Sequence, residues 1–455
     1  MVEGRGVRQE TALSGVRDAV AGRPALLRAV GVWALAASIF NLTVGGGIFR
    51  APALAASMLG PAAPVAYLVC AVAMGLIVLC FAEAGSRVSR TGGPYAYVEI
   101  VFGPLVGFLA GVLVWLTGTL AFAGVSVILA GTVASFVPAL GTTAGRALFL
   151  IALFVAMTWI NVRGVRQGAR LVTVASVAKL LPLILLIVLG LPAVRSEYIA
   201  MPAMPDAATL ARGSIILIFI FAGIESALVP SGEVRTPART VPRAIAIAMI
   251  AVTVVYLSIQ LVAQGILGPA LANSSVPLAD AAAIGLGPWG RTLLIAGATV
   301  SMVGYVSGMT LAIPRALFAF AENGMLPRQL AAVHPRFRTP HVAIVVQSAL
   351  VCVLAIMSNF EQIAVIANLS ALLLYLGCVA AAWELRRRDI RAGDGVPFRL
   401  PLGPVVHLLT AAVIIFLLTS ITSREWALVG AVLLGAALLF ALTASRRARA
   451  AESTA

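Results

Sequence analysis

The sequence predicts an all-α polytopic membrane protein with twelve transmembrane helices, because of its composition, its apolar runs and the placement of its arginines. The chain has 455 residues, of which 61% are hydrophobic and 11% charged, and its mean hydropathy is +1.04. A soluble domain has about 45–50% apolar and about 25% charged residues, so this chain has too little polar surface for folding in water. A bilayer accepts the excess as spans of about 20 residues each.

Apolar runs of helical length alternate with short polar segments along the chain. We expect spans at residues 30–57, 61–85, 96–137, 145–162, 171–193, 211–231, 243–267, 291–320, 341–358, 362–383, 402–421 and 426–444. Within the long third run, a single helix over 104–137 measures about 51 Å and must tilt or carry interfacial turns. One helix is favoured over two because it keeps the arginines at 163–170 on the side of the N-terminus.

The arginines predict the orientation of these spans. With twelve spans both termini are cytoplasmic, and all but six of the 31 arginines lie in or beside cytoplasmic segments, as the positive-inside rule requires. The expected order is a cytoplasmic tail (1–29), five spans (30–193), five more (211–383), two further spans (402–444) and a second cytoplasmic tail (445–455). We expect this multi-pass protein in the plasma (inner) membrane.

Several other classes of protein are excluded by the residues themselves. The net charge of +15 comes from short basic clusters between apolar runs, which does not suit nucleic-acid binding. The four cysteines lie inside apolar runs and the three histidines are scattered, so no metal site is expected. We find no phosphate-binding loop for ATP-driven transport and no nucleophile–base set for an enzyme, and expect no cofactor.

The first and sixth spans both carry helix-breaking residues at mid-membrane depth. Gly45–Gly47 stand together in the first span, and each glycine costs a helix about 1 kcal/mol relative to alanine. The sixth span combines Gly223 with the ionisable Glu225. Five spans separate the two segments, so their orientations oppose each other. This is the pattern of a five-plus-five inverted repeat in which a discontinuous helix opens each half.

Two adjacent breaks predict a site for a zwitterion. A helix that stops in the membrane leaves N–H groups free at one break and C=O groups free at the other, and these attract an anion and a cation. A substrate carboxylate would meet the amides of Gly45, Gly46 and Gly47, and an ammonium would meet carbonyls near Thr43, Phe219, Ala222 and Gly223. Close helix packing is the alternative reason for the glycines, while a buried carboxylate such as Glu225 favours function.

Lys179 is the single lysine of the chain and lies in the fifth span. It follows Arg170 by nine residues, which places it about 13 Å along the helix. Its compact ammonium would satisfy free carbonyls at the first break, as a sodium ion does elsewhere, and by losing its proton it would couple transport to a proton gradient. The alternative is snorkelling of the amine to the cytoplasmic interface.

A series of short motifs resembles the amino acid–polyamine–organocation family of permeases over residues 30–445. The motifs, in chain order, are Gly45-Gly46-Gly47-Ile48-Phe49, Phe81-Ala82-Glu83, Gly92-Gly93-Pro94-Tyr95, Phe221-Ala222-Gly223-Ile224-Glu225, Gly232-Glu233-Val234-Arg235-Thr236-Pro237, Pro314-Arg315 and Asn323-Gly324-Met325-Leu326-Pro327. The resemblance implies a LeuT-like five-plus-five fold with two extra helices. It also implies alternating access around a central amino acid site.

The resemblance also implies roles for individual residues. The amides of Gly46 and Gly47 would hold the carboxylate, Phe219 would be an aromatic gate, Glu225 would sense protonation, and Lys179 is similar to a lysine of sodium-independent members. The implied activity is amino acid transport by proton symport or exchange. Transport of polyamines or organic cations is one alternative, and a channel or sensor of the same fold is another.

Two residues depart from the family pattern. Gly46 stands where many members have serine or alanine, and Arg50 stands where apolar or small residues are commoner. For Arg50 three readings stay open: an outer ion pair with Glu225, a preference for anionic substrates, or snorkelling to the headgroups. Glu83 is expected to form cytoplasmic ion pairs, and Trp115 and Tyr305 are expected either in the pocket or in helix packing.

Overall fold

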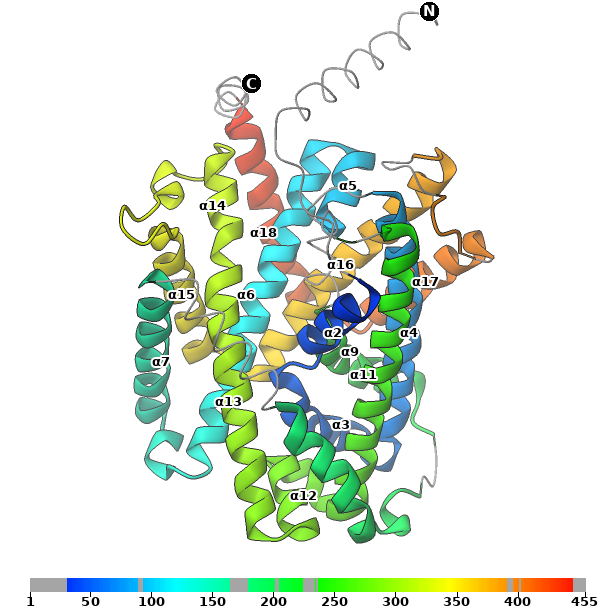
Figure 1. Ribbon diagram of the computed structural model, residues 1–455, viewed down its shortest axis with the longest axis vertical. Helices are drawn as coiled ribbons and strands as arrows, with labels where there is room; N and C mark the ends of the chain where they lie inside the picture. The colour runs from blue at the N-terminus through cyan, green and yellow to red at the C-terminus, as the bar shows by residue number, and fades with distance from the viewer. Residues whose placement is uncertain are drawn as a thin grey trace, which may run out of the picture.

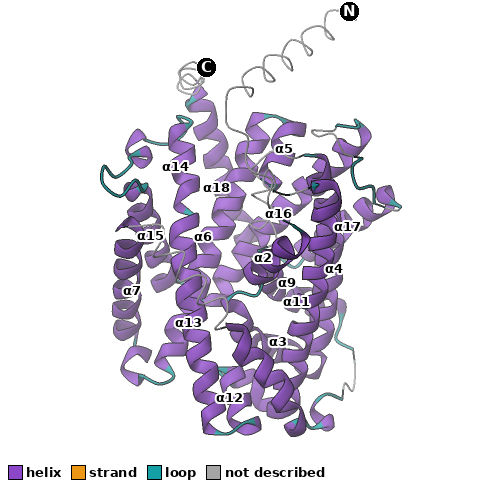
Figure 2. Cartoon of the chain, viewed as in Figure 1, coloured by secondary structure: helices purple, strands orange, loops and turns teal. Residues whose placement is uncertain are grey.

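The structure is a computed structural model that describes residues 31–88, 93–163, 179–200, 204–223, 234, 236–390, 396–400 and 402–444. Over these ranges the chain forms helices and turns, with no β-strand (Figure 2). The all-α prediction is therefore confirmed for the part of the chain that the structure describes. Glu225, Arg170 and the two tails lie outside it.

Seven helical stretches within the described residues are long and apolar enough to cross a membrane. They are Ala51–Arg87, Pro104–Ala134, Thr143–Arg163, Arg239–Asn273, Pro288–Glu322, Phe360–Arg387 and Ser423–Leu442. Shorter apolar helices are Val32–Thr43, Lys179–Ala193, Ala207–Phe221, His341–Met357 and Gly403–Leu418. Each predicted span overlaps one of these segments.

The labelled helices have the following bounds. They are α2 (Val32–Thr43), α3 (Ala51–Leu59), α4 (Ala63–Arg87), α5 (Pro94–Phe102), α6 (Pro104–Ala134), α7 (Thr143–Arg163), α9 (Ala207–Phe221), α11 (Pro237–Leu267), α12 (Pro277–Gly285), α13 (Pro288–Ala312), α14 (Pro314–Glu322), α15 (His341–Met357), α16 (Phe360–Arg387), α17 (Gly403–Leu418) and α18 (Ser423–Leu442). Short 3₁₀ segments include η1 (Gly46–Phe49), η2 (Gly60–Ala62), η5 (Ser196–Tyr198) and η7 (Gly268–Asn273).

The third predicted run consists of two helices and not one continuous segment. Gly103, with φ +86°, ends α5 and starts α6, since a positive φ is accessible to glycine but disfavoured for other residues. From Pro104 onward the run is a single helix of 31 residues. The preference for one long helix over two spans is thus confirmed, whereas the stretch before Gly103 is a separate short helix.

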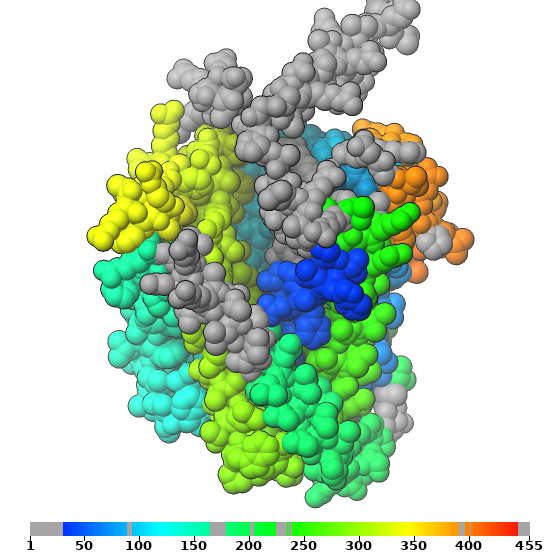
Figure 3. Space-filling view, in the orientation of Figure 1, coloured from blue at the N-terminus to red at the C-terminus, as the bar shows by residue number. Residues whose placement is uncertain are grey.

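The short helices α2 and α9 pack against long ones. α13 runs from the end of the molecule that holds α12 to the end that holds α5 and α14 (Figure 1). α6 packs against α16 and α13, and α2 packs against α11. Figure 3 shows α2, in blue, at the surface of one face, where the side chain of Trp33 is 75% exposed. Exposed apolar side chains of this size suit a surface that faces lipid.

Glu83 joins three segments near the ends of α4 and α16. Its fully buried carboxylate pairs with Arg87 at 3.4 Å and with Arg386 at 3.2 Å, and it accepts the backbone N–H of Leu400. Burying a carboxylate is costly unless it is paired and hydrogen-bonded. The prediction that Glu83 forms ion pairs is confirmed.

Candidate functional site

The first helix is interrupted immediately after Thr43, where α2 ends. Val44 has φ −73° and ψ 75°, the geometry of an inverse γ-turn. The N–H of Gly45 accordingly donates to the Thr43 carbonyl over 2.7 Å. The chain resumes as η1 at Gly46 and then continues into α3. The first N–H groups of a helix have no partner within that helix, so the amides of Gly46 and Gly47 are oriented for an external acceptor.

Lys179 supplies donors to the carbonyl groups at this interruption. Its Nζ donates to the carbonyl of Asn41 over 2.5 Å and to that of Val44 over 2.7 Å. The lysine is only 6% exposed, so its ammonium lies inside the protein. Carbonyls at a helix C-terminus lack intrahelical partners and attract a cation. The ammonium therefore lies where the sequence analysis expected it, beside the broken end of the first helix.

The end of α9 touches the interruption of the first helix, and the structure describes the chain there as far as Gly223. α9 ends at Phe221, and Gly223 follows with φ +124°. A Cβ atom at Gly223 would lie 2.9 Å from the carbonyl oxygen of Leu42, which is closer than such atoms can approach. Glycine at this position thus serves both the backbone conformation and the contact between the two interrupted chains.

Tyr256 of α11 joins the two interruptions. Its hydroxyl lies 2.8 Å from the carbonyl oxygen of Thr43 and 2.8 Å from that of Ile220, and the residue is fully buried. A hydroxyl has a single proton, so the two carbonyls share one donor. The sequence analysis did not identify this residue; a lone tyrosine within an apolar run of α11 was the available signal.

Replacing Tyr256 by phenylalanine is expected to destabilise the protein by about 1–3 kcal/mol, because a buried carbonyl loses its donor. Thermal unfolding in detergent, followed by tryptophan fluorescence, measures the change. Tyr67 provides a matched control, since it is also fully buried and its hydroxyl has no hydrogen-bond partner in the described structure. Equal stability losses in Tyr256→Phe and Tyr67→Phe would contradict the bridging role.

A cavity of about 540 Å³ lies against both interruptions. The predicted residues that line it are Thr43, Gly45, Gly46, Gly47, Phe219, Ala222, Gly223 and Lys179. The rest of the wall comes mainly from α6, α13 and α16. The structure thus brings together at one cavity all the predicted site residues that it describes.

The cavity extends from the interruptions toward one end of the molecule. Gly46 lies against Val125 and Met302, while the wall continues along α6 back to Val114 and along α13 forward to Ile313. Both directions lead to the end that holds α5 and α14 (Figure 1). The cavity therefore approaches that end of the molecule from the level of the interruptions.

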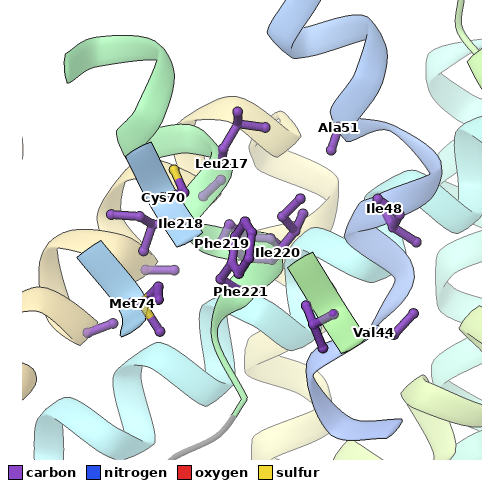
Figure 4. Packing of buried hydrophobic residues seen from close by; sticks show 14 of the residues in the cluster. Val44, Ile48, Ala51, Cys70, Met74, Leu217, Ile218, Phe219, Ile220 and Phe221 are labelled. Atoms are coloured by element: carbon purple, nitrogen blue, oxygen red, sulfur yellow. The ribbon is translucent and has the colours of Figure 1, made fainter. Parts of the chain in front are cut away.

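Aromatic side chains cover the opposite side of the interruptions. The rings of Phe219 and Phe360 meet edge to face with centroids 5.1 Å apart, and both residues are buried. In Figure 4 the last turn of α9, with Phe219 and Ile220, lies between the segment of Val44 and Ile48 and the helix of Cys70 and Met74. Phe219, which lines the cavity, is thus packed against the first residue of α16.

The neighbours of Gly46 explain its departure from the family pattern. A Cβ atom there would lie 2.7 Å from Cγ1 of Val125 and 2.9 Å from Cγ of Met302. Alanine or serine would therefore need these side chains to move. At Gly45, by contrast, no atom comes closer to the added Cβ than 3.8 Å.

Some predicted site atoms have other partners in this conformation. The N–H of Gly45 donates to the carbonyl of Thr43. The same carbonyl also accepts from the hydroxyl of Tyr256. Thr43 lines the cavity, and its buried side-chain hydroxyl has no hydrogen-bond partner among the described residues. Gly45 therefore contributes shape more than a donor.

The structure adds polar residues that sequence reasoning missed. Thr117 lines the cavity, and its buried hydroxyl has no hydrogen-bond partner in the described chain. Asn368 also lines it, while its Nδ2 donates to the Ile215 carbonyl over 2.5 Å. Tyr305 belongs to the cavity wall, whereas Trp115 donates to Gln347 outside it. Polar residues within apolar spans were the signal for these positions.

A broken first helix that meets the end of another apolar helix at one cavity is an arrangement typical of membrane transport proteins. The chain belongs to the amino acid permease family, whose family model matches residues 30–438. It is 29% identical to the serine/threonine exchanger SteT of Bacillus subtilis over 394 residues, which cover 84% of this chain and 88% of SteT.

Two further relatives come from the same organism. The branched-chain amino acid permease BcaP is 25% identical over 91% of this chain and 94% of its own length. The methylthioribose transporter is 27% identical over 86% of this chain and 89% of its own length. The expectation of an amino acid permease family member is confirmed.

Proposed function

We propose that this protein is a secondary active transporter that carries amino acids across the plasma membrane by alternating access. The observation that carries the proposal is the contact, at one cavity, between the interrupted first helix and the end of α9. The start of η1 leaves N–H groups without intrahelical partners, and the end of α9 leaves carbonyl groups without them. A zwitterion presents the complementary pair of charges. The names of SteT and BcaP, an amino acid exchanger and an amino acid permease, support the same substrate class.

The substrate contacts in this proposal follow from the donors and acceptors around the cavity. The amides of Gly46 and Gly47 hold the α-carboxylate, while the absence of side chains there makes room for the neighbouring side chains of the protein, such as Val125 at Gly46 and Ile220 at Gly47. The carbonyls of Phe219 and Ala222, next to the end of α9, hold the α-ammonium. The unpartnered hydroxyl of Thr43 adds a further contact. Phe219 is the gate that separates the site from the other side of the membrane.

We further propose that transport needs no sodium ion. The ammonium of Lys179 already satisfies carbonyls at the first interruption, where a bound cation would otherwise serve. Coupling then runs through protons or through exchange of one amino acid for another. Glu225 remains the proposed proton-sensing carboxylate, and it lies outside the described residues. The relative SteT is an exchanger, which favours exchange.

The proposed topology has twelve crossings with both termini cytoplasmic and a five-plus-five inverted repeat followed by two helices. Support comes from the apolar helices, because each predicted span overlaps at least one of them. The break after α2 and the end of α9 at Phe221, just before Gly223, are compatible with the repeat. In this topology the end with α5 and α14 faces the cytoplasm, so the cavity is open toward the inside and Phe219 and Phe360 close the outside.

Polyamines and other cations are less suited to this cavity. An amine-rich substrate needs carboxylates around it, and no acidic side chain lines the cavity within the part of the chain that the structure describes. The charged residue in the described wall is Lys179, which repels a cation. Amino acids with neutral side chains therefore fit the wall best. The methylthioribose relative makes a neutral sugar the second candidate, because its name indicates a substrate without a zwitterionic group.

Uptake by proteoliposomes tests the proposal. We expect saturable uptake or exchange of a labelled neutral amino acid, independent of sodium, with putrescine and methylthioribose as competitors that fail to inhibit. Saturation distinguishes a carrier from a channel of the same fold. Inhibition by methylthioribose but by no amino acid would replace the amino acid with the sugar. Absence of transport for every amino acid would refute the proposed function.

A further inference from the structure

Arg50 links the outer half of the first helix to a distant loop. It lies between η1 and α3, three residues after Gly47. Its partly buried guanidinium donates from Nη1 to the main-chain carbonyl of Ser274, which follows η7. Glu361, at the start of α16, acts on the same positive charge. The structure thus gives Arg50 a partner that the sequence analysis did not foresee.

The acceptor of this hydrogen bond is held in place by its own contacts. The hydroxyl of Ser274 donates to Oδ2 of Asp280 over 2.6 Å and accepts from the N–H of Val276 over 3.2 Å. Asp280 in turn lies 3.6 Å from Nε of Arg291 in α13. The loop carbonyl is therefore fixed to α12 and α13, so a movement of α3 away from the loop must break the bond with Arg50.

The hydrogen bond between Arg50 and Ser274 lies near the elements that close the site in the proposed function. η7 packs along α3, which begins directly after Arg50. Glu361 follows Phe360, whose ring covers Phe219. Arg50 thus lies among the same elements that close the site on the side away from the cavity. It is not among the residues of the cavity wall.

We propose that Arg50 is a latch that keeps the outer side of the site closed while the cavity is open to the other side. Release of Ser274 lets α3 leave the loop, and the guanidinium then faces Glu361 or water. This inference rests on the proposed alternating access, because a latch has a function only if the outer side opens. It makes Arg50 a residue that sets the balance between two conformations and not a substrate contact.

Thiol labelling from each side of the membrane tests the latch without measuring transport. Ser301→Cys places a reporter in the cavity wall, in a Cys352→Ala background because Cys352 is the one cysteine that is not buried. A membrane-impermeant maleimide is applied to right-side-out and inside-out vesicles. Arg50→Gln is expected to raise the outside labelling rate by about tenfold, since a hydrogen bond from a charged group biases a two-state equilibrium by that amount or more.

Controls separate the latch from general damage. Arg146→Gln is matched, because Arg146 also donates to main-chain carbonyls, of Ala355 and Ser358 at 2.8 and 2.9 Å; it should leave labelling unchanged. Should Arg50→Gln be unstable, Asp280→Asn loosens the Ser274 loop and should shift labelling in the same direction. Unchanged outside labelling in folded variants at both positions overturns the latch.

The two proposals can fail separately. A wild-type protein that takes up no amino acid, but whose outside labelling rises in Arg50→Gln, loses the proposed substrate and keeps the latch. A wild-type protein that transports, with labelling that does not respond to Arg50→Gln or Asp280→Asn, keeps the proposed function and loses the latch.

Discussion

Lys179→Ala is expected to reduce amino acid uptake by about a hundredfold. The substitution removes the donors of the Asn41 and Val44 carbonyls, and an unsatisfied buried carbonyl costs about 1–3 kcal/mol. A loss near 3 kcal/mol at the site corresponds to about two orders of magnitude in rate. Initial uptake rates in proteoliposomes, normalised to the amount of reconstituted protein, measure the effect.

Two further substitutions determine which property of the lysine matters. Lys179→Met keeps the chain length but has no donor, so it should fail like alanine. Lys179→Arg keeps the charge on a larger planar group and should recover only part of the rate. Arg195→Ala, at an exposed arginine outside the cavity, controls for loss of positive charge. Near-normal uptake by Lys179→Met would show that the ammonium is dispensable.

Gly46→Ala should weaken substrate binding by at least about tenfold, the effect of roughly 1.4 kcal/mol. The added Cβ would lie 2.7 Å from Val125 and 2.9 Å from Met302, and overpacking of this kind costs about 1–3 kcal/mol. Relief of the clash would displace η1, and with it the amides that we assign to the carboxylate. Substrate-dependent thermal shift and uptake KM measure the change.

Because the clash at position 46 involves two identified side chains, shortening one of them should rescue the Gly46→Ala variant. Val125→Ala removes the nearer methyl group, and the unbranched side chain of Met302 can adjust, so Gly46→Ala/Val125→Ala should regain most of the lost affinity. Gly45→Ala is the matched control at the neighbouring residue, where the nearest atom is 3.8 Å away, and its effect should be much smaller. An equal loss at both glycines, or a double variant no better than Gly46→Ala, would argue against steric exclusion at Gly46.

Most of the fold could be predicted because lipid imposes strict rules on sequence. Apolar length fixes the helices, and glycines or an ionisable residue within a span mark where a helix stops. The break at Gly45–Gly47 and the end of α9 just before Gly223 were predictable for this reason. The short helix before Gly103 was not separated, because hydropathy stays high across a glycine that turns the chain.

The contacts between helices could not be predicted from the sequence. Periodicity places a residue on a face but does not say which residue of another helix it meets. Tyr256 could be seen as a polar residue in an apolar run, yet its two carbonyl partners are 36 and 213 residues away. Likewise, the side chains that exclude a Cβ at Gly46 come from α6 and α13, and the acceptor of Arg50 lies 224 residues along the chain.

The single proton of Tyr256 has a consequence for how substrate enters and leaves. The carbonyl oxygens of Thr43 and Ile220 lie at equal distance from the Tyr256 hydroxyl. At any moment only one of them can accept its proton. The Thr43 oxygen also accepts the N–H of Gly45, so the phenol can turn wholly to the Ile220 oxygen and leave neither carbonyl without a donor. In the proposed transport cycle, a substrate that takes up or releases contacts at the end of α9 thus requires only a small torsion of this one hydroxyl.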